Sequence, residues 1–324
     1  MNIPYDSFDM TRLMHDADAA PSILNTKPWK FEKVAENRIE LRPDWTRHLK
    51  VIDPRHRELV ISCGAALFNL RMAIRVTGHD PVVWLFPDQQ PGQAQRCKHC
   101  GKYCGVGDIL ASVEIITRRP HPVTVTLQRL YEAIPQRHTI REPFTRPLPM
   151  SVQAEMEQAA RKEGARARLL NKADTRRLLR SAALTERMLK GDEAYLAELR
   201  KWTGSNAHSG LGVRAEEFGP QPGGSRHPPV RDLGIAWGSR RHARFEKRAQ
   251  LIALETETDK PSDWLRAGQA LQRVLLTATY YGVQASFLTQ QLEEEDRRIR
   301  PFQAAQPQWR WRDSAQMVIR VGQA

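Results

Sequence analysis

The sequence lacks the features that mark membrane, secreted and disulfide-rich proteins. No uncharged apolar run reaches the roughly 18 residues that a bilayer-spanning helix needs. The opening residues, MNIPYDSFDM, contain two acidic side chains and neither the basic cluster nor the apolar stretch of a signal peptide. Four cysteines in 324 residues are too few for a disulfide framework, which agrees with a reducing compartment. We therefore expect a cytoplasmic protein that makes no contact with a membrane.

Common motifs for nucleotide and hydrolase chemistry are also missing. The sequence contains no GxGxxG, P-loop, HExxH or GxSxG. Rossmann dinucleotide binding, nucleoside triphosphate hydrolysis and serine hydrolysis therefore have no support. The ten histidines are dispersed, and the sequence identifies no side-chain catalytic acid or base.

The net charge of +13 raises the question of nucleic-acid binding. Arginine and lysine are scattered over the whole chain with acidic residues nearby, as in 184–201, and no basic stripe with interleaved aromatics is present. We expect a solvated, arginine-rich surface and no nucleic-acid partner. A few of these charges remain available for a phosphate-bearing cofactor.

The length predicts two packed units. In the first, residues 1–122, helical character over 10–20 ends before Pro21, and a hairpin of short strands turns at Glu36-Asn37. Residues 58–78 are apolar almost all round and end at a glycine, which predicts a buried helix. A strand over 81–86 completes this unit.

The second unit, residues 123–324, repeats part of this pattern. Another helix, 262–282, is nearly free of charge after Arg273 and ends at a glycine. Since each unit has a buried helix followed by a strand, a divergent duplication is indicated. The remaining predicted elements are helices over 126–134 and 151–164, a strand over 165–170, one or two charged helices within 172–201, and a strand over 314–322.

Two segments interrupt these units. Residues 203–248 contain eight glycines and four prolines without a sustained period. A loop of this length in a compact domain is a functional lid or is disordered, and we expect a lid. The other segment, near 90–107, contains three of the four cysteines.

The cysteine-containing segment carries a candidate metal site. Cys97, His99, Cys100 and Cys104 form a C-x₂-C-x₃-C pattern with an internal histidine, and zinc prefers thiolate and imidazole ligands. A second complete pair is missing, so three interpretations stay open: a zinc site, an iron–sulfur cluster, or reactive thiols without a metal. Cys63 falls within the buried helix and is expected in the core.

Residues 20–29, APSILNTKPW, form a polar turn between a helix and a strand. Taken alone, its short polar side chains would bond to nearby backbone amides. The segment resembles the APSxxNxQPW motif of FMN-dependent nitroreductases, with six positions matching in order. The resemblance implies that Ser22 and Asn25 contact the flavin ring and ribityl chain. Lys27 replaces the usual glutamine, and it either stabilises an anionic reduced flavin or points to solvent.

Residues 135–144, PQRHTIREPF, bring two arginines and a histidine close together in a loop. The planar guanidinium group matches phosphate oxygens. Such a cluster also occurs in ordinary solvated turns. The segment resembles the RRSxRxF motif that holds the FMN phosphate in nitroreductases, which implies that role for Arg137, His138, Thr139 and Arg141. By the same resemblance, Arg320 in the last strand closes on the phosphate.

A third segment, GVQASFLTQ at 282–290, follows the second buried helix. In nitroreductases this strand runs along the flavin, and a backbone N–H donates to flavin N5. The resemblance implies that the donor belongs to Leu288, Thr289 or Gln290. Only the backbone role carries over, because these side chains differ from the usual ones.

Together these segments resemble the Acg branch of the nitroreductase superfamily over residues 11–322, most weakly across 90–110 and 203–248. The resemblance implies an α+β, nitroreductase-like fold, internally duplicated as a pseudo-dimer, with one FMN under a lid. A monomer is then sufficient for cofactor binding.

The expected function is FMN-dependent oxidoreduction by hydride transfer. One alternative is an FMN-sequestering or redox-sensing protein without efficient turnover, and another is a biosynthetic flavoenzyme with one dedicated metabolite. The sequence identifies neither the substrate nor the electron donor.

Overall fold

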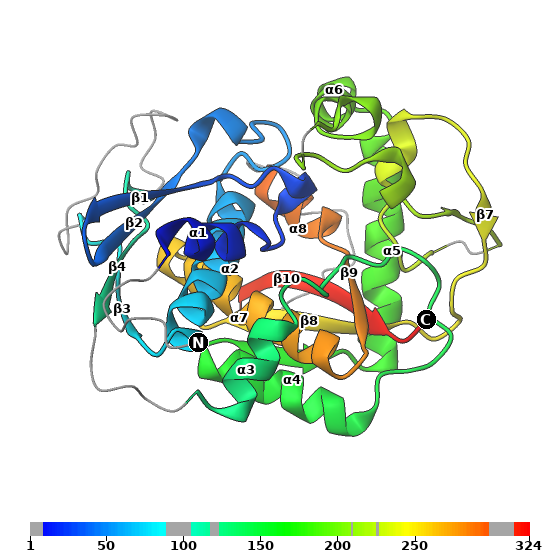
Figure 1. Cartoon of the computed structure of the whole chain (residues 1–324). Helices are drawn as coiled ribbons and strands as arrows, with labels where there is room; N and C mark the ends of the chain where they lie inside the picture. The colour runs from blue at the N-terminus through cyan, green and yellow to red at the C-terminus, as the bar shows by residue number, and fades with distance from the viewer. Residues whose placement is uncertain (1–8, 89–104, 117–122, 209, 225–226, 298–313) are drawn as a thin grey trace.

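The protein is an α+β structure, as expected, and its described residues form two four-stranded antiparallel sheets (Figure 1). It is described by a computed structural model covering residues 9–88, 105–116, 123–208, 210–224, 227–297 and 314–324. The segment with Cys97, His99, Cys100 and Cys104 lies outside the described residues.

The first sheet has the strand order β1-β2-β4-β3 and is accompanied by two helices. A tight hairpin joins β1 to β2, and the central strand β4 is buried on both faces. The elements are α1 (Met10–Asp18), β1 (Trp29–Ala35), β2 (Arg38–Pro43), α2 (Arg57–Val76), β3 (Asp80–Leu85) and β4 (Ala111–Ile116), with short 3₁₀ turns at Ile23–Asn25 and Trp45–Arg47.

The second sheet has the strand order β5-β8-β10-β9. Helices α5 and α8 cover one of its faces, where their leucines join Leu251 and Val318 in a separate apolar cluster. The elements are α3 (Val125–Glu132), α4 (Met150–Lys162), β5 (Arg166–Leu169), α5 (Lys172–Leu189), α6 (Glu193–Lys201), β8 (Gln250–Thr256), α7 (Pro261–Tyr280), β9 (Gln284–Phe287), α8 (Gln290–Arg297) and β10 (Ser314–Gly322).

The two sheets share one connection pattern. In each, a long helix follows the second strand and leads to an edge strand, and the last strand then pairs between them. Helix α2 packs on the first sheet, α7 packs on the second, and the two helices pack on each other. The core is therefore a stack of sheet, helix, helix and sheet.

The crossing of α2 and α7 depends on two glycines. A Cβ atom at Gly64 would collide with the backbone carbonyl of Leu265, and one at Gly268 would collide with that of Ile61. Because backbone atoms cannot rotate away, only glycine permits this approach at either position. Both helices are buried along most of their length, as their sequences predicted.

Helix α2 is long and apolar enough to span a bilayer by length and composition. Most of it is buried against α7 and the first sheet, however. We therefore assign it as the core helix of a globular fold.

The predicted helices and strands are present with shifts of one or two residues at most ends, and 172–201 forms two helices separated at Gly191. Strands β4 and β8 were not predicted, since both are central strands whose buried residues do not alternate. Helix α8, which is rich in charge, was also not predicted.

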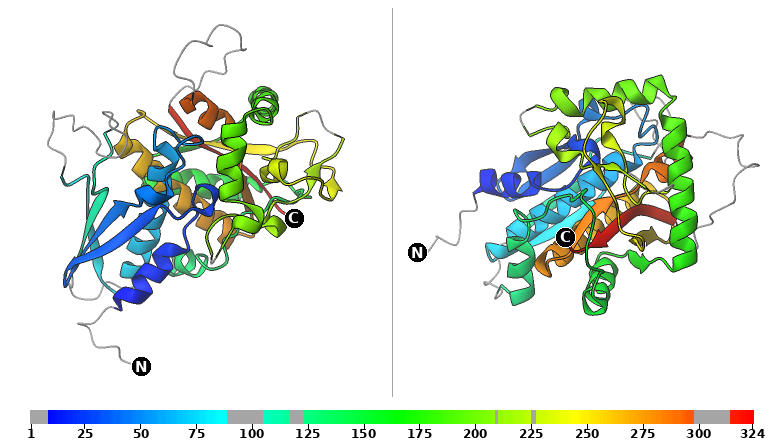
Figure 2. Two further views of the ribbon diagram at one scale, coloured as in Figure 1. Left: turned by 90° about the horizontal axis from the view of Figure 1, so that it is seen from above. Right: turned by 90° about the vertical axis from the view of Figure 1, so that its right-hand side faces the viewer.

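The 203–248 segment has little regular structure but packs closely. Its short elements are 3₁₀ turns at Gly204–Asn206, Ala215–Glu217 and Leu233–Ala236, and a two-strand pair of β6 (Gln221–Pro222) and β7 (His242–Ala243). Val213, Phe218 and Leu233 share a buried apolar cluster with Leu24 and with Leu199 of α6. Figure 2 shows this segment with α5 and α6 on one side of the molecule, away from the first sheet.

Gly64→Ala is expected to destabilise the protein by about 2–3 kcal/mol, because the added methyl group forces α2 and α7 apart. Urea unfolding gives the free energy directly. The control is Gly191→Ala, where a Cβ meets nothing nearer than 3.6 Å. Equal stabilities for the two variants would show that the close crossing is not required.

Candidate functional site

One cavity of about 390 Å³ gathers most of the residues singled out in the sequence. Its walls come from the turn at 18–27, α2, the loop at 134–141, the 203–248 segment and the region around β9. Eight predicted residues line it: Ser22, Asn25, Lys27, Arg137, His138, Thr139, Arg141 and Thr289. Leu288, Gln290 and Arg320 do not.

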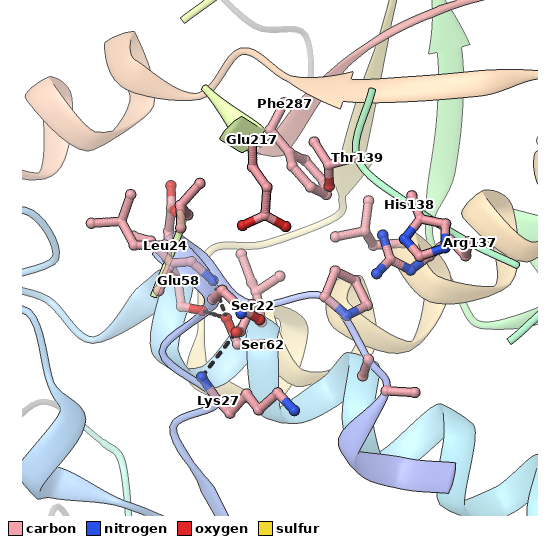
Figure 3. A pocket seen from close by; sticks show the side chains of 18 of the residues that line it. Ser22, Leu24, Lys27, Glu58, Ser62, Arg137, His138, Thr139, Glu217 and Phe287 are labelled. Atoms are coloured by element: carbon pink, nitrogen blue, oxygen red, sulfur yellow. Dashed lines mark hydrogen bonds between the residues drawn. The ribbon is translucent and has the colours of Figure 1, made fainter. Parts of the chain in front are cut away.

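The cavity has a basic end and a polar end. Figure 3 shows Arg137, His138 and Thr139 at one end, and Ser22, Ser62 and Glu58 at the other. Apolar side chains complete the lining, among them Ile61, Ile134, Leu233, Leu271, Phe287 and Met317. The volume falls within the roughly 300–1,000 Å³ typical of cofactor and small-ligand sites.

The turn that carries Ser22 is held in an unusual backbone conformation. Leu24, Asn25 and Lys27 all have positive φ angles of 44° to 52°. Residues other than glycine adopt this region at a cost, and such strain concentrates at functional sites. Two hydroxyl groups stabilise the turn: Ser22 Oγ accepts a hydrogen bond from the Lys27 N–H (2.9 Å), and Ser62 Oγ accepts one from the Ile23 N–H (3.1 Å).

Asn25 joins this turn to the 203–248 segment. Its side-chain amide donates to the main-chain carbonyls of Gly210 (3.1 Å) and Gly212 (2.9 Å). The main-chain carbonyl of Asn25 accepts a hydrogen bond from the Gly212 N–H. The amide is therefore used to fix the segment over the cavity.

Neither predicted role of Lys27, stabilising a reduced flavin or pointing to solvent, fully describes its position. It lines the cavity, yet its ammonium group lies 2.6 Å from an Asp18 carboxylate oxygen. Its charge is therefore partly neutralised where it stands.

The basic loop is attached to the edge of the second sheet. Thr139 bridges to Ala285 of β9, and the Ile140 N–H donates to the Ala285 carbonyl (2.9 Å). This pairing places Arg137 and Arg141 on the cavity side. Arg141 donates to the Glu217 carbonyl (2.7 Å) in the 203–248 segment.

Both arginines are partly buried cations. Burial lowers the pKa of Arg137 and the pKa of Arg141 to about 10. Within the described part of the chain, no carboxylate lies within 4 Å of either guanidinium group, and Arg137 Nε has no hydrogen-bond partner. Two poorly compensated cations at the end of a cavity are what an anionic ligand would need.

The three candidate backbone donors differ in availability. The Leu288 N–H already donates to the Val318 carbonyl of β10 (3.0 Å). Thr289 lines the cavity, and its N–H has no hydrogen-bond partner among the described residues. Gln290 is buried, and its side chain donates to Glu186. Thr289 is therefore the best placed of the three.

Arg320 is buried behind the basic loop rather than exposed to the cavity. It pairs with Glu246 (2.5 and 2.7 Å), donates to the Glu142 carbonyl and packs on the ring of Phe144. Its Nη1 atom has no hydrogen-bond partner within the described residues. Its predicted role stays a prediction.

A group of buried charges at the polar end was not anticipated from the sequence. Arg231 of the 203–248 segment makes a double ion pair with Glu293 (2.5 and 2.9 Å) and donates to the Tyr195 hydroxyl (3.0 Å). Burial opposes the charge on Arg231, but Glu293 more than offsets this and raises the pKa of Arg231. Glu58 lies beside this pair and lines the cavity. The sequence signal for this buried group was Glu58, a carboxylate in an otherwise largely apolar helix.

No group of metal-ligating side chains occurs among the described residues. The predicted zinc ligands fall outside them, so that site stays a prediction. Cys63 is buried in α2, as expected for a core residue.

No family model matches the chain, but individual proteins do. A Mycobacterium tuberculosis protein provisionally named NAD(P)H nitroreductase is 32% identical over 278 residues, which are 85% of this chain and 74% of that protein. The chain belongs to the nitroreductase family. An uncharacterised protein of the same organism is 30% identical over 312 residues, covering 94% of this chain and 83% of its own length. A third relative, named acg, is 28% identical over 280 residues, 83% of this chain and 76% of its own, and it confirms the predicted branch.

Arg231→Met is expected to destabilise the protein by about 3–5 kcal/mol, because it leaves the carboxylate of Glu293 buried without its partner. Adding Glu293→Gln should recover most of the loss. Urea unfolding of the single and double variants measures both effects. The control is Arg241→Met, which breaks an exposed pair with Glu142 in the same segment and should cost less than about 1 kcal/mol. A similar cost for both single variants would contradict the buried pair.

Proposed function

We propose that the protein binds one FMN in this cavity and acts as a nitroreductase-like oxidoreductase that transfers hydride. The observation that carries the proposal is the pair of partly buried arginines at one end of the cavity, without carboxylate partners among the described residues. FMN combines a phosphate with a large planar ring, which matches a basic end followed by apolar walls.

The phosphate end would use the loop at 137–141. Arg137 and Arg141 supply guanidinium donors, and Thr139 and His138 line the same end of the cavity. Arg320 does not line the cavity as it stands, so its proposed contact with the phosphate, through the Nη1 left over from its pairing with Glu246, would need a rearrangement of the loop in front of it.

The ring end would use the turn at 22–27 and the start of α8. Ser22, Asn25 and Lys27 line that side, and the Thr289 N–H is the candidate partner for flavin N5. A bound flavin supplies hydride chemistry, and the protein positions the ring and excludes water. Phe287 and Leu271 provide apolar contacts for it.

We infer that the 203–248 segment is a lid over this flavin. Gly210, Val213, Glu217, Arg231 and Leu233 close one side of the cavity. The segment is held by an apolar cluster, by the Asn25 bonds and by the Arg231–Glu293 pair. Such an anchored lid restricts access for large substrates.

The same closure favours the alternative function, an FMN-sequestering or redox-sensing protein. Mixing the FMN-loaded protein with NADPH or NADH without oxygen separates the two. Rapid bleaching of the flavin absorbance supports the enzyme, and an unchanged spectrum supports sequestration.

We infer an internal duplication from the strand orders. Matching β1-β2-β4-β3 with β5-β8-β10-β9 also matches α2 with α7 and α1 with α4. The halves differ at the site: residues 19–28 join α1 to β1, whereas only 163–165 join α4 to β5. The second half therefore lacks the turn that carries Ser22 and Asn25, and one complete site remains per chain.

The purified protein is expected to be yellow and to release FMN rather than FAD on denaturation. Replacing both Arg137 and Arg141 with Ala should weaken FMN binding by about 2–4 kcal/mol through loss of charge-assisted hydrogen bonds. Fluorescence titration of the flavin-free protein measures this. The exposed residues Arg180 and Arg187 of α5, replaced together with Ala, serve as the control. Equal affinity in both double variants would refute the phosphate assignment.

One FMN per polypeptide is expected, bound by a monomer, because both halves of the site belong to one chain. Flavin absorbance against protein concentration, with mass from light scattering, gives the stoichiometry. Two FMN per chain, or loss of flavin whenever a dimer dissociates, would contradict this arrangement.

A further inference from the structure

Glu58 is a buried carboxyl group at the wall of the proposed flavin cavity. It stands in the first turn of α2 with a relative exposure of 4%. Figure 3 shows it among Leu24, Ser22 and Ser62 at the polar end. A buried carboxylate needs a cation or several donors to remain ionised.

The cations near Glu58 are engaged by other carboxylates. Arg57 Nε lies 2.6 Å from Asp296, whereas Arg57 Nη2 is 3.3 Å from Glu58. Arg231 makes its double ion pair with Glu293. Because both cations pair more closely with other carboxylates, Glu58 keeps only the longer contact with Arg57.

Other carboxyl groups near Glu58 add to the excess of negative over positive charge. Asp53 accepts the N–H groups of Glu58 (3.1 Å) and Leu59 (2.8 Å) at the start of α2. Asp53, Glu58, Glu293 and Asp296, together with Asp259 on Arg55, thus make five carboxyl groups around Arg57, Arg231 and the half-exposed Arg55. Five carboxyl groups against three cations are most easily accommodated if not all of them are ionised. Burial and the charge of Glu293 raise the pKa of Glu58 well above its usual range, which agrees with this count.

We propose that Glu58 holds a proton in the resting protein and donates it to the substrate in the flavin cavity. This inference rests on the proposed function. A substrate double bond that accepts a hydride from FMN, reduced beforehand by a nicotinamide dinucleotide, gains a negative charge on its second atom. The Glu58 O–H bond breaks, and the proton forms a bond to that atom. The carboxylate left behind lies next to Arg57 and Arg231, and solvent returns the proton.

A second carboxylate of the cavity wall, Glu217, provides a matched comparison. Glu217 is half-exposed, accepts the Arg214 N–H (2.8 Å) and lies 3.7 Å from the Arg214 guanidinium. It belongs to the 203–248 segment and is exposed to water, whereas Glu58 is buried. Glu217→Gln therefore removes a carboxyl group from the same cavity without touching the buried cluster.

Infrared spectroscopy of the flavin-free protein at pH 7 tests the proton directly. Burial also raises the pKa of Asp53 and the pKa of Glu186 to about 7, so the comparison uses difference spectra against the wild type. Glu58→Gln should lose one C=O stretching band of a protonated carboxyl group, and Glu217→Gln should keep it. The same band in Glu58→Gln and wild type would overturn the proposal. If Glu58→Gln does not fold, Glu293→Gln is used instead, and the band should then titrate at lower pH, because Arg231 is freed to pair with Glu58. An unchanged titration would overturn the proposal.

Kinetics test the donation. In the FMN-loaded protein, Glu58→Gln should slow oxidation of the reduced flavin by menadione, a quinone probe, by about 100-fold. Reduction of the flavin by NADPH should change much less. Equal slowing of both steps, or of neither, would overturn the role in donation. Failure to bind FMN would refute the proposed function, whereas the infrared result on Glu58 does not depend on flavin.

Discussion

The close crossing of α2 and α7 is the constraint on which the rest of the structure depends. Gly64 and Gly268 let the two backbones meet, and this brings the two sheets into one core. The same contact sets the position of the cavity, since Ile61 and Ser62 approach it from α2 and Leu271 from α7. A wider crossing would separate the polar turn from the basic loop.

Charge is distributed unequally around this cavity. At one end, Arg137 and Arg141 lack carboxylate partners among the described residues, and burial lowers the pKa of each. At the other end, carboxyl groups outnumber their cations around Arg57 and Arg231. Buried charge of either sign is costly unless it is neutralised, so both ends point to ligands or protons. A cofactor with a phosphate at one end and redox chemistry at the other fits this polarity.

Much of the fold was predictable because its longest elements have clear sequence signals. The two buried helices are apolar on all sides, and the hairpin alternates in its second strand. Strands β4 and β8 were not predicted, because a central strand that is buried on both faces does not alternate apolar and polar residues. Eight of the predicted cofactor residues line one cavity. They could be predicted because they belong to three short motifs, each of which can be recognised in the sequence.

What the sequence did not reveal are contacts between distant segments. Arg231 lies in an irregular stretch, and only folding brings it to Glu293, 62 positions away along the chain. The same holds for Asn25, whose amide meets Gly210 and Gly212. Arg320 was assigned from a strand position alone, and its pairing with Glu246 depends on where the end of the 203–248 segment folds back. Local patterns do not contain this information.

The central claim is that the basic end of the cavity recognises a flavin phosphate. Comparing the affinities of FMN and riboflavin for the flavin-free protein tests it most directly, because the two ligands differ only in that group. Loss of the charge-assisted hydrogen bonds should make riboflavin bind at least about 2 kcal/mol more weakly than FMN. The difference should shrink when Arg137 and Arg141 are both replaced. Equal affinities of the wild-type protein for the two flavins would contradict the account.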